Sequence, residues 1–383
     1  MVALSLFVLQ HARRALPALT IASVVVQLIG AFWYPGASEA GVLGGDPASP
    51  LSPTPAAELS DMAKRAGTAL RDRQRPPGYW ITSYTAGMNF EATHAEMNTF
   101  LTAMMVDFLA PIASEYNLDE AVDRARKHLV AQIEGNGLVR YHGLPDAPTI
   151  GTLGNVITPD ADDTSLAWRI GGSVTDARRE GMLKELTSYR DARGLYRTWL
   201  APVEKYQSLN PGRDPNPADL AIQMHVYLML REFDPAAAQS LCSVMQRFAN
   251  DDEVWVYYAK APLIPYLRSA EVRQRGCAVP LPDVRLAHSV PGQEVWCEIV
   301  RRFVDANTSQ PSKSDSQAIF ALLAKIGGDD FAALRRTPPL LYHNDLTATV
   351  SRYYWSEDFG YALWLRLYNL ARRQANSSAG TGL

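Results

Sequence analysis

Three carboxylates stand close together at one place in the chain, in the run Thr158-Pro159-Asp160-Ala161-Asp162-Asp163-Thr164-Ser165. Apolar residues follow directly, which indicates that a loop turns into a helix here. Like charges this close oppose one another's ionisation, so one carboxyl can keep its proton near neutral pH. A protonated carboxyl held in an apolar cavity can act as a general acid. The alternative role is an N-terminal helix cap, which can coexist with the first.

A repeat of helical hairpins surrounds this run. The first helix of each unit is expected at residues 63–73, 119–132 and 178–190. These helices end near Gln74, Gln132 and Arg190, which lie 58 residues apart, and each loop that follows closes on a glycine. The second, apolar helix of each unit is expected at residues 95–109, 164–170 and 218–230, and further helices at 239–250, 316–326 and 361–373. This period predicts stacked helical hairpins. About six such hairpins in a ring predict an all-α fold, an α/α toroid with a central cavity.

These motifs resemble those of a known family. Gln74-x-x-x-Gly78-x-Trp80 resembles the QW motif of squalene–hopene cyclases and related prenyltransferase and squalene-oxidase repeat proteins. The run Asp160–Thr164 resembles the DxDD(T) motif of class II terpene cyclases. The resemblance implies that Asp162 is the acid that protonates an alkene or epoxide, and that Asp160 and Asp163 orient and tune it. Hopene-type cyclases carry two such α-domains, whereas the chain has room for about one. The whole pattern more closely resembles a small group of single-domain proteins with the same repeat, and that resemblance covers about residues 60–270.

Aromatic and polar side chains near the repeat junctions are the expected substrate contacts. Aromatic faces stabilise carbocations through their quadrupoles, as an alkene-protonating enzyme requires. His94 stands in the first repeat at the place analogous to the Asp run. The residues expected to bind substrate are Trp80, Tyr84, His94, Trp168, Trp199, Tyr258 and Tyr354. His225 lies among apolar residues in mid-helix, where a hydrogen-bonded core histidine is the expected role.

The N-terminal part differs in composition from the rest. Arg13 and Arg14 precede an uncharged, largely apolar stretch, and small residues at Ser38 and Ala40 suit a signal-peptidase cut. The stretch is also long enough to span a bilayer. We therefore expect residues 1–40 to be a signal peptide or membrane anchor, 41–58 a Pro/Gly-rich linker, and 59–383 the toroid domain. The protein is then exported, either periplasmic or extracellular, or anchored in the inner membrane.

Composition excludes several other classes. A net charge of −3 and an isoelectric point near 6.2 argue against nucleic-acid binding. The sequence carries no CxxC or HExxH pattern that would indicate a metal site, and nothing in it suggests a cofactor. Of three cysteines, Cys277 and Cys297 could pair after export and leave Cys242 as a buried thiol, but the sequence does not decide this.

Three functions remain. The first is acid-initiated cyclisation, isomerisation or dehydration of a terpenoid or polyprenyl lipid, with Asp162 as general acid and a membrane-soluble neutral substrate. The second is a non-catalytic toroid that binds a lipid, glycan or protein. The third is carbohydrate chemistry, which requires a second acidic residue across the cavity from the first. A dry aromatic pocket would favour the first function, a filled core the second, and an open acidic groove the third.

Overall fold

Helices form most of the chain that the computed structural model describes, namely residues 56–86, 90, 94–143, 157–172, 175–205, 214–281, 291–308, 313–347 and 350–380. The α-helices are α1 (Ala56–Arg73), α2 (Thr99–Leu109), α3 (Asp119–Ala131), α4 (Ala161–Gly171), α5 (Asp176–Ser188), α6 (Leu220–Phe233), α7 (Pro235–Phe248), α8 (Leu263–Gln274), α10 (Glu294–Thr308), α11 (Lys313–Arg336) and α12 (Glu357–Gly380). The expected signal or anchor at 1–40, and the linker up to residue 55, lie outside the described residues. The sequence predicted an all-α fold, and the structure confirms that the described residues are mostly helical.

The same tight loop follows α1, α3 and α5. In each, the amide of a glycine donates to the carbonyl three residues earlier: Gly78 to Arg75 at 2.8 Å, Gly137 to Glu134 at 2.9 Å and Gly194 to Asp191 at 3.0 Å. All three glycines have positive φ, a conformation that other residues rarely adopt. The side chains of Gln74 and Arg190 bond the carbonyls of Gly78 and Gly194 respectively, and so tie the loop to the preceding helix end. The 58-residue spacing therefore corresponds to a repeated structural unit.

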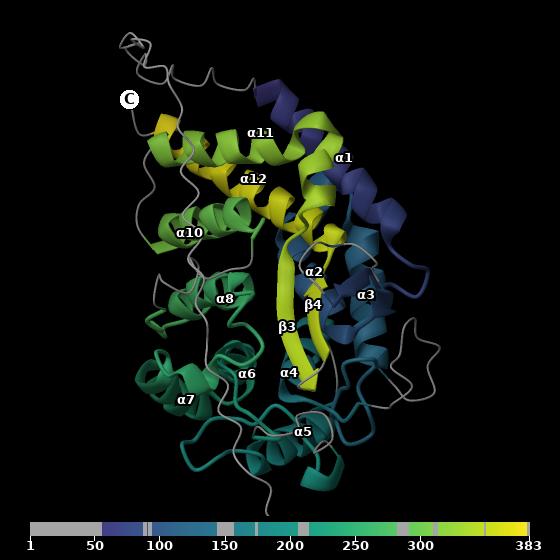
Figure 1. Cartoon of the computed structure of the whole chain (residues 1–383), viewed down its shortest axis with the longest axis vertical. Helices are drawn as coiled ribbons and strands as arrows, with labels where there is room; N and C mark the ends of the chain where they lie inside the picture. The colour runs from purple at the N-terminus through teal and green to yellow at the C-terminus, as the bar shows by residue number, and fades with distance from the viewer. Residues whose placement is uncertain are drawn as a thin grey trace, which may run out of the picture. The chain divides into compact units, whose positions relative to one another are not determined.

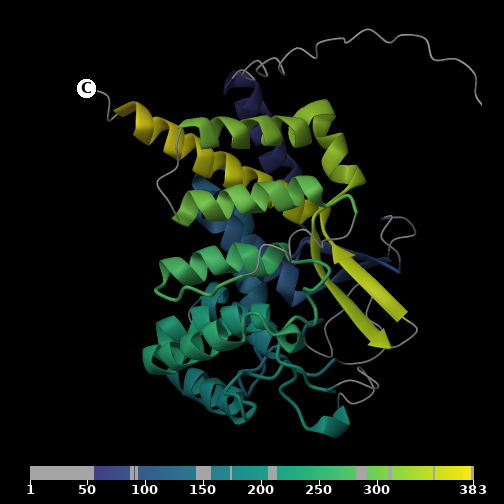
Figure 2. The same cartoon turned by 60° about the vertical axis from the view of Figure 1, so that its left-hand side comes forward.

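The second helices of the units pack side by side in a closed circuit. α2 packs on α4, α4 on α6, α6 on α8 and α8 on α10; α11 and α12 then lead back to α2. The first helices lie outside this circuit, with α3 against α2 and α4, and α1 against α12, as Figures 1 and 2 show. Polar caps start three of the circuit helices: Asn98 for α2, Asp160 for α4 and Asp219 for α6.

A four-stranded antiparallel sheet corrects the all-α expectation. Its strands are β1 (Ile81–Thr85), β2 (His94–Met97), β3 (Leu340–Thr347) and β4 (Val350–Trp355), in the order β2-β1-β4-β3. The aromatic and β-branched residues of β3 and β4 favour strands over helices. His94 accordingly stands in a strand, paired with Tyr84, rather than at a helix start. Figures 1 and 2 show β3 and β4 on one side of the helices.

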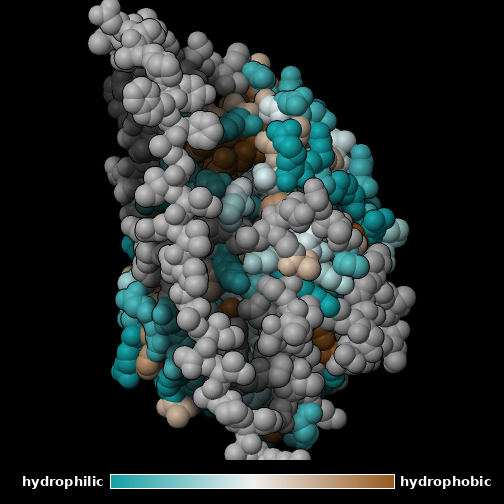
Figure 3. All heavy atoms as spheres, viewed as in Figure 1, coloured by the Kyte–Doolittle hydropathy of each residue, from teal (hydrophilic) through white to brown (hydrophobic). Residues whose placement is uncertain are grey.

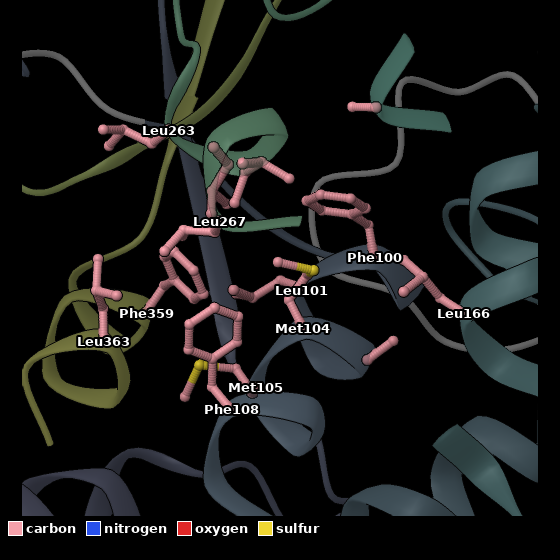
Figure 4. Packing of buried hydrophobic residues seen from close by; sticks show 14 of the residues in the cluster. Phe100, Leu101, Met104, Met105, Phe108, Leu166, Leu263, Leu267, Phe359 and Leu363 are labelled. Carbon is pink, nitrogen blue, oxygen red and sulfur yellow. The ribbon is translucent and has the colours of Figure 1, made fainter. Parts of the chain in front are cut away.

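The core is built around α2. Ten of its eleven residues are buried, since its sequence is apolar on every side. Figure 4 shows Leu101, Met104 and Phe108 of α2 facing Leu267 of α8 and Phe359 of α12. The rings of Phe108 and Phe359 meet edge to face at 5.3 Å. This packing fills one part of the space inside the circuit.

The face of the molecule shown in Figure 3 carries many polar side chains among the described residues. Hydrophilic side chains gather over α1 in Figure 3. Among the described residues, the exposed large apolar side chain is that of Val203. No helix in the described ranges is both long and apolar enough to cross a bilayer.

The disulfide joins Cys242 of α7 to Cys277, just after α8, with a Cα–Cα distance of 5.7 Å. The pairing of Cys277 with Cys297 considered from the sequence is therefore wrong. Cys297 is buried in α10, apart from this disulfide. Both α7 and α8 pack on α6, and this brings the middle of α7, with Cys242, close to Cys277 just after α8. Sequence spacing does not reveal this proximity.

Candidate active site

A cavity of about 90 Å³ lies beside α2, between the start of α4, α6 and the sheet. Its walls are mainly aromatic, with the three carboxyl groups of the Asp run on one side. The lining residues are Phe100, Tyr141, His142, Ile157, Asp160, Asp162, Asp163, Thr198, Trp199, Ile222, Tyr257, Tyr258, Tyr342, Asn344 and Tyr354.

The Asp run occupies the first turn of α4. Asp160 is the N-cap: its Oδ1 accepts the backbone N–H of Asp163 at 2.7 Å. The side chain of Asp163 also hydrogen-bonds to that of Asp160. The segment that follows the loop after α5 anchors the start of α4, because the N–H of Ala161 donates to the carbonyl of Thr198 at 2.8 Å. The cap role and a position on the cavity wall therefore coexist.

Asp162 is held by different partners. Its Oδ1 contacts Nδ1 of His225, which is fully buried in α6, and its Oδ2 lies 3.4 Å from the hydroxyl of Tyr258. Asp160 and Asp163 thus hydrogen-bond to each other. Asp162 is instead oriented by His225 of α6 and by Tyr258, which lies in the segment before α8. The resemblance had implied that its two neighbours in sequence orient it.

Arg268 of α8 determines the tautomer of His225. Its Nε–H donates to His225 Nε2 at 3.0 Å, so Nε2 accepts and Nδ1 carries the ring proton toward Asp162. Burial lowers the pKa of His225, which favours this neutral ring. Arg268 and Arg169 are paired with Asp107 and Glu271, so that the buried cluster behind His225 is balanced in charge.

Burial makes the carboxyls around this site hard to ionise. It raises the pKa of Asp160 to about 7 and that of Asp163 well above its ordinary value, and the repulsion between the carboxylates adds to both shifts. Because Asp163 keeps its proton, it donates to Asp160. Burial also raises the pKa of Asp219 to about 7, although three backbone N–H groups donate to its carboxylate.

Asp219 positions the tyrosines of the cavity wall. Its Oδ2 accepts the backbone N–H groups of Val256 and Tyr257, at 2.8 and 2.9 Å, while its Oδ1 caps α6. The same carboxylate thereby fixes the start of the helix that carries His225 and the segment that carries Tyr258. The sequence alone indicates only the capping half of this role, because Asp219 precedes an apolar run.

Three of the aromatic residues expected from the sequence line the cavity: Trp199, Tyr258 and Tyr354. Trp80 and Trp168 do not. Their indole N–H groups donate to the carbonyls of Leu70 and Gly137, at 3.0 and 2.7 Å, in the packing between helices and repeat loops.

Tyr84 and His94 also lie apart from the lining residues. Their rings stack at 5.1 Å on the paired strands β1 and β2, and His94 is exposed. Tyr84 also contacts the ring of Tyr354 at 5.4 Å, so it supports a lining residue from behind.

Several lining or supporting residues were not expected from the sequence: Phe100, Tyr141, His142, Tyr342 and Arg268. The ring of Tyr342 stacks on that of Tyr354 with their centroids 4.4 Å apart, and its centroid lies 6.4 Å from that of Tyr258. It comes from β3, a strand that the helical interpretation did not include. His225 was expected to be a hydrogen-bonded core histidine; it is, but its partner is Asp162. The described residues contain no group of three His, Cys, Asp or Glu side chains arranged to hold a metal.

Comparison with known proteins establishes the fold. No protein-family model and no curated protein matches the sequence. The structure is similar to the type II terpene cyclase MstE from Scytonema in its apo form, with a TM-score of 0.53, 14% identity, and coverage of 83% of this chain and 99% of that one. An MstE variant in complex with its substrate geranylgeranyl dihydroxybenzoate gives a TM-score of 0.48 at 15% identity, covering 83% of this chain and 98% of that chain. The crystal structure of a protein from Actinoplanes gives a TM-score of 0.48 at 14% identity, covering 82% of this chain and 99% of that chain. The chain therefore has a terpene cyclase-like fold, in agreement with the resemblance seen in the sequence.

Proposed function

We propose that this protein is an enzyme that transforms a neutral terpenoid or polyprenyl lipid with Asp162 as general acid, which protonates a carbon–carbon double bond in cyclisation or isomerisation and a hydroxyl group in dehydration. The reaction class is cyclisation, isomerisation or dehydration. We further propose that the helix circuit is an α/α toroid of the terpene cyclase type. The observation that carries the proposal is the contact between Asp162, on the wall of an aromatic cavity, and the neutral His225.

The contact with His225 suits a proton donor. When the π electrons of an alkene take the proton of Asp162, one alkene carbon gains a C–H bond, the other becomes a cation, and Asp162 becomes a carboxylate. The Nδ1–H of His225 already points at that carboxylate and stabilises it as it forms. Oδ2 is the oxygen left to hold the reactive proton. After the reaction, solvent water returns a proton to the Asp162 carboxylate.

The walls suit a cation. Phe100, Tyr258, Tyr342 and Tyr354 present aromatic rings to the cavity, and each ring face attracts positive charge. Among the described lining residues there is no Lys or Arg, which would be needed to hold a diphosphate. This supports a neutral isoprenoid as the substrate class.

The two other functions have less support. A glycosidase needs two carboxyl groups on opposite sides of the bond to be cleaved. The acidic residues among the described lining all belong to the first turn of α4, so they share one side. A purely structural cap does not account for His225, because the cap interaction uses Asp160 and leaves Asp162 free to face α6.

Turnover in D₂O tests the proposal. The purified full-length protein is incubated with a panel of neutral isoprenoids, including squalene and prenylated phenols, and the products are analysed by mass spectrometry. An acid-initiated reaction places one deuterium on the protonated carbon. Asp162→Asn, which keeps the size of the side chain, should lower turnover by at least about 100-fold, the usual minimum effect of a general acid.

His225→Ala and a matched control complete the experiment. His225→Ala removes the donor to Asp162 and should slow the same step. His128→Ala changes a histidine of α3 whose ring contacts Tyr79 at 5.4 Å, outside the cavity lining, and should leave turnover unchanged. Full activity in Asp162→Asn, or product without deuterium, would refute the role of Asp162.

We also propose export, with residues 1–40 as signal peptide or anchor. The disulfide between Cys242 and Cys277 supports this, because disulfides persist mainly in oxidising compartments. A membrane-associated protein would meet neutral lipids directly. Fractionation of cells that produce the full chain tests this proposal; recovery in the cytoplasm with reduced thiols would contradict it.

A further inference from the structure

Glu96 and His142 form a second buried polar cluster at the cavity. Glu96 is fully buried on β2, where the donors around its carboxylate are Asn98 Nδ2 at 3.4 Å, the hydroxyl of Tyr141, and His142 Nε2 at 3.3 Å. His142 is 6% exposed and lines the same cavity as Asp162. The capping and acid roles derived above use neither Glu96 nor His142.

The imidazole of His142 has one nitrogen paired and one free. Nε2 faces the carboxylate oxygen Oε2 of Glu96, an acceptor, so the neutral ring carries its proton at Nε2. Nδ1 is buried and has no hydrogen-bond partner in the described structure. A buried, unpaired nitrogen of this kind is costly unless a ligand or a reaction uses it. The tautomer fixed by Glu96 therefore leaves an unpaired lone pair on Nδ1 of a residue that lines the cavity.

Other groups on the wall are poorer proton acceptors. Burial raises the pKa values of Tyr141, Tyr258 and Tyr342 well above their ordinary value, so these phenols stay protonated. Both ring nitrogens of His225 are occupied, one by Asp162 and the other by Arg268.

A row of aromatic rings joins the two sites. The hydroxyl of Tyr258 lies beside Asp162, and its ring contacts Tyr342 at 6.4 Å. Tyr342 contacts Tyr141 at 6.2 Å, and Tyr141 contacts His142 at 4.7 Å. As the positive charge moves along the carbon skeleton of a substrate bound between Asp162 and the imidazole, it would therefore stay beside aromatic rings.

We propose that His142, oriented by Glu96, is the general base that ends the reaction by removing a proton from the final carbocation. Nδ1 takes a proton from the carbon next to the cationic centre, and the electron pair of that C–H bond forms the new double bond. The imidazolium that results is paired with the Glu96 carboxylate and returns its proton to water. The product is an alkene isomeric with the substrate. This role rests on the proposed function, in which Asp162 supplies the first proton.

Product analysis of two variants tests the role. His142→Phe and Glu96→Gln should still consume substrate and incorporate deuterium from D₂O within about tenfold of wild type, because initiation at Asp162 is intact. The rate of formation of the native alkene should fall by at least about 100-fold in His142→Phe, with alcohols from water capture or other alkene isomers in its place. His128→Phe, outside the cavity lining, should give the native product. Thermal unfolding checks that each variant is folded.

The outcomes separate this role from the proposed function. An unchanged product mixture in both variants, with Asp162→Asn inactive, overturns the role of His142 alone. A wild-type product that is an alcohol also overturns it. Wild-type protein that converts no isoprenoid overturns both.

The tautomer gives a test that does not depend on turnover. ¹⁵N NMR of histidine-labelled protein, with His142→Phe used for assignment, should show Nε2 protonated and Nδ1 unprotonated in the neutral ring. Glu96→Gln should shift this balance. A proton found on Nδ1 of His142 in the wild type would contradict the proposal.

Discussion

Asp162 differs from Asp160 and Asp163 in its partners, although the three lie within four residues of sequence. On a helix, neighbouring residues point in different directions, so Asp160 caps the helix and bonds Asp163 while Asp162 faces α6. The partner of Asp162 is 63 residues away in sequence. Residue type and spacing predict a group of carboxyls here; they do not predict which histidine meets which carboxyl.

The raised pKa of Asp160 predicts that activity falls as pH rises through about 7. A second negative charge beside Asp162 opposes its conversion to a carboxylate and so slows proton donation. Asp160→Asn removes that charge, and asparagine caps a helix as well as aspartate does. The pH–rate profile of Asp160→Asn should therefore lack the fall near pH 7, and a profile identical to that of wild type would contradict this origin.

Stability should follow the same titration. The pKa of Asp160 is about 7 in the folded state against 3.8 ordinarily, so its proton favours folding. This contribution to the free energy of unfolding is complete below pH 3.8 and is lost as pH rises through 7. Denaturant unfolding at several pH values should show a smaller loss of stability in Asp160→Asn than in wild type.

At the scale of elements, the circuit helices and the segments between them contribute different kinds of side chain to the cavity. The helix starts at Asn98, Asp160 and Asp219 bring polar side chains to corresponding places, while the segments before α4 and α8 supply aromatic rings. The sheet adds Tyr342 and Tyr354 from strands that are distant in sequence from the repeats.

Asp219→Ala should destabilise the protein and impair the site together. The substitution leaves the amides of Val256 and Tyr257 without their acceptor in a buried place, which costs about 1–3 kcal/mol for each unsatisfied group. The segment that holds Tyr258 against Asp162 also loses its anchor. The free energy of unfolding and turnover measure the two effects.

Asp234→Ala is the matched control for this change. Asp234 caps α7 through Ala237 N–H at an exposed position, so its loss should cost about 1 kcal/mol with turnover retained. Equal losses of stability and of activity in the two variants would show that Asp219 acts only as a cap.

For the whole folded unit, the disulfide between Cys242 and Cys277 should matter for stability. It joins two cysteines 35 residues apart in sequence, one within α7 and one just after α8, and the loss of a native disulfide typically costs about 2–5 kcal/mol. Reductant, or the double change Cys242→Ser with Cys277→Ser, should lower the melting temperature. Cys297→Ser is the control, because it removes a buried thiol and leaves the disulfide in place. Its melting temperature, measured with and without reductant, separates the effect of losing the disulfide from that of losing a buried thiol. A melting temperature insensitive to reductant in wild type would contradict the bond.

The sequence by itself predicted the helical repeat, since hydrophobic periodicity and glycine-closed loops are local properties. It also located the start of α4 and the cavity-side tyrosines Tyr258 and Tyr354, together with Trp199. It failed for Trp80 and Trp168, because an aromatic at a repeat junction packs a core as readily as it lines a cavity.

Only the tertiary structure decided what the carboxyls can do. The pairing of Asp162 with His225, the tautomer fixed by Arg268 and the approach of Tyr342 all depend on side chains from α4, α6, α8 and β3 meeting at one cavity. Burial, which raises the pKa values of Asp160 and Asp163, is likewise a property of the folded chain. Local sequence specifies which groups are present; long-range packing sets their distances and their solvent exposure, and these two quantities control acid chemistry.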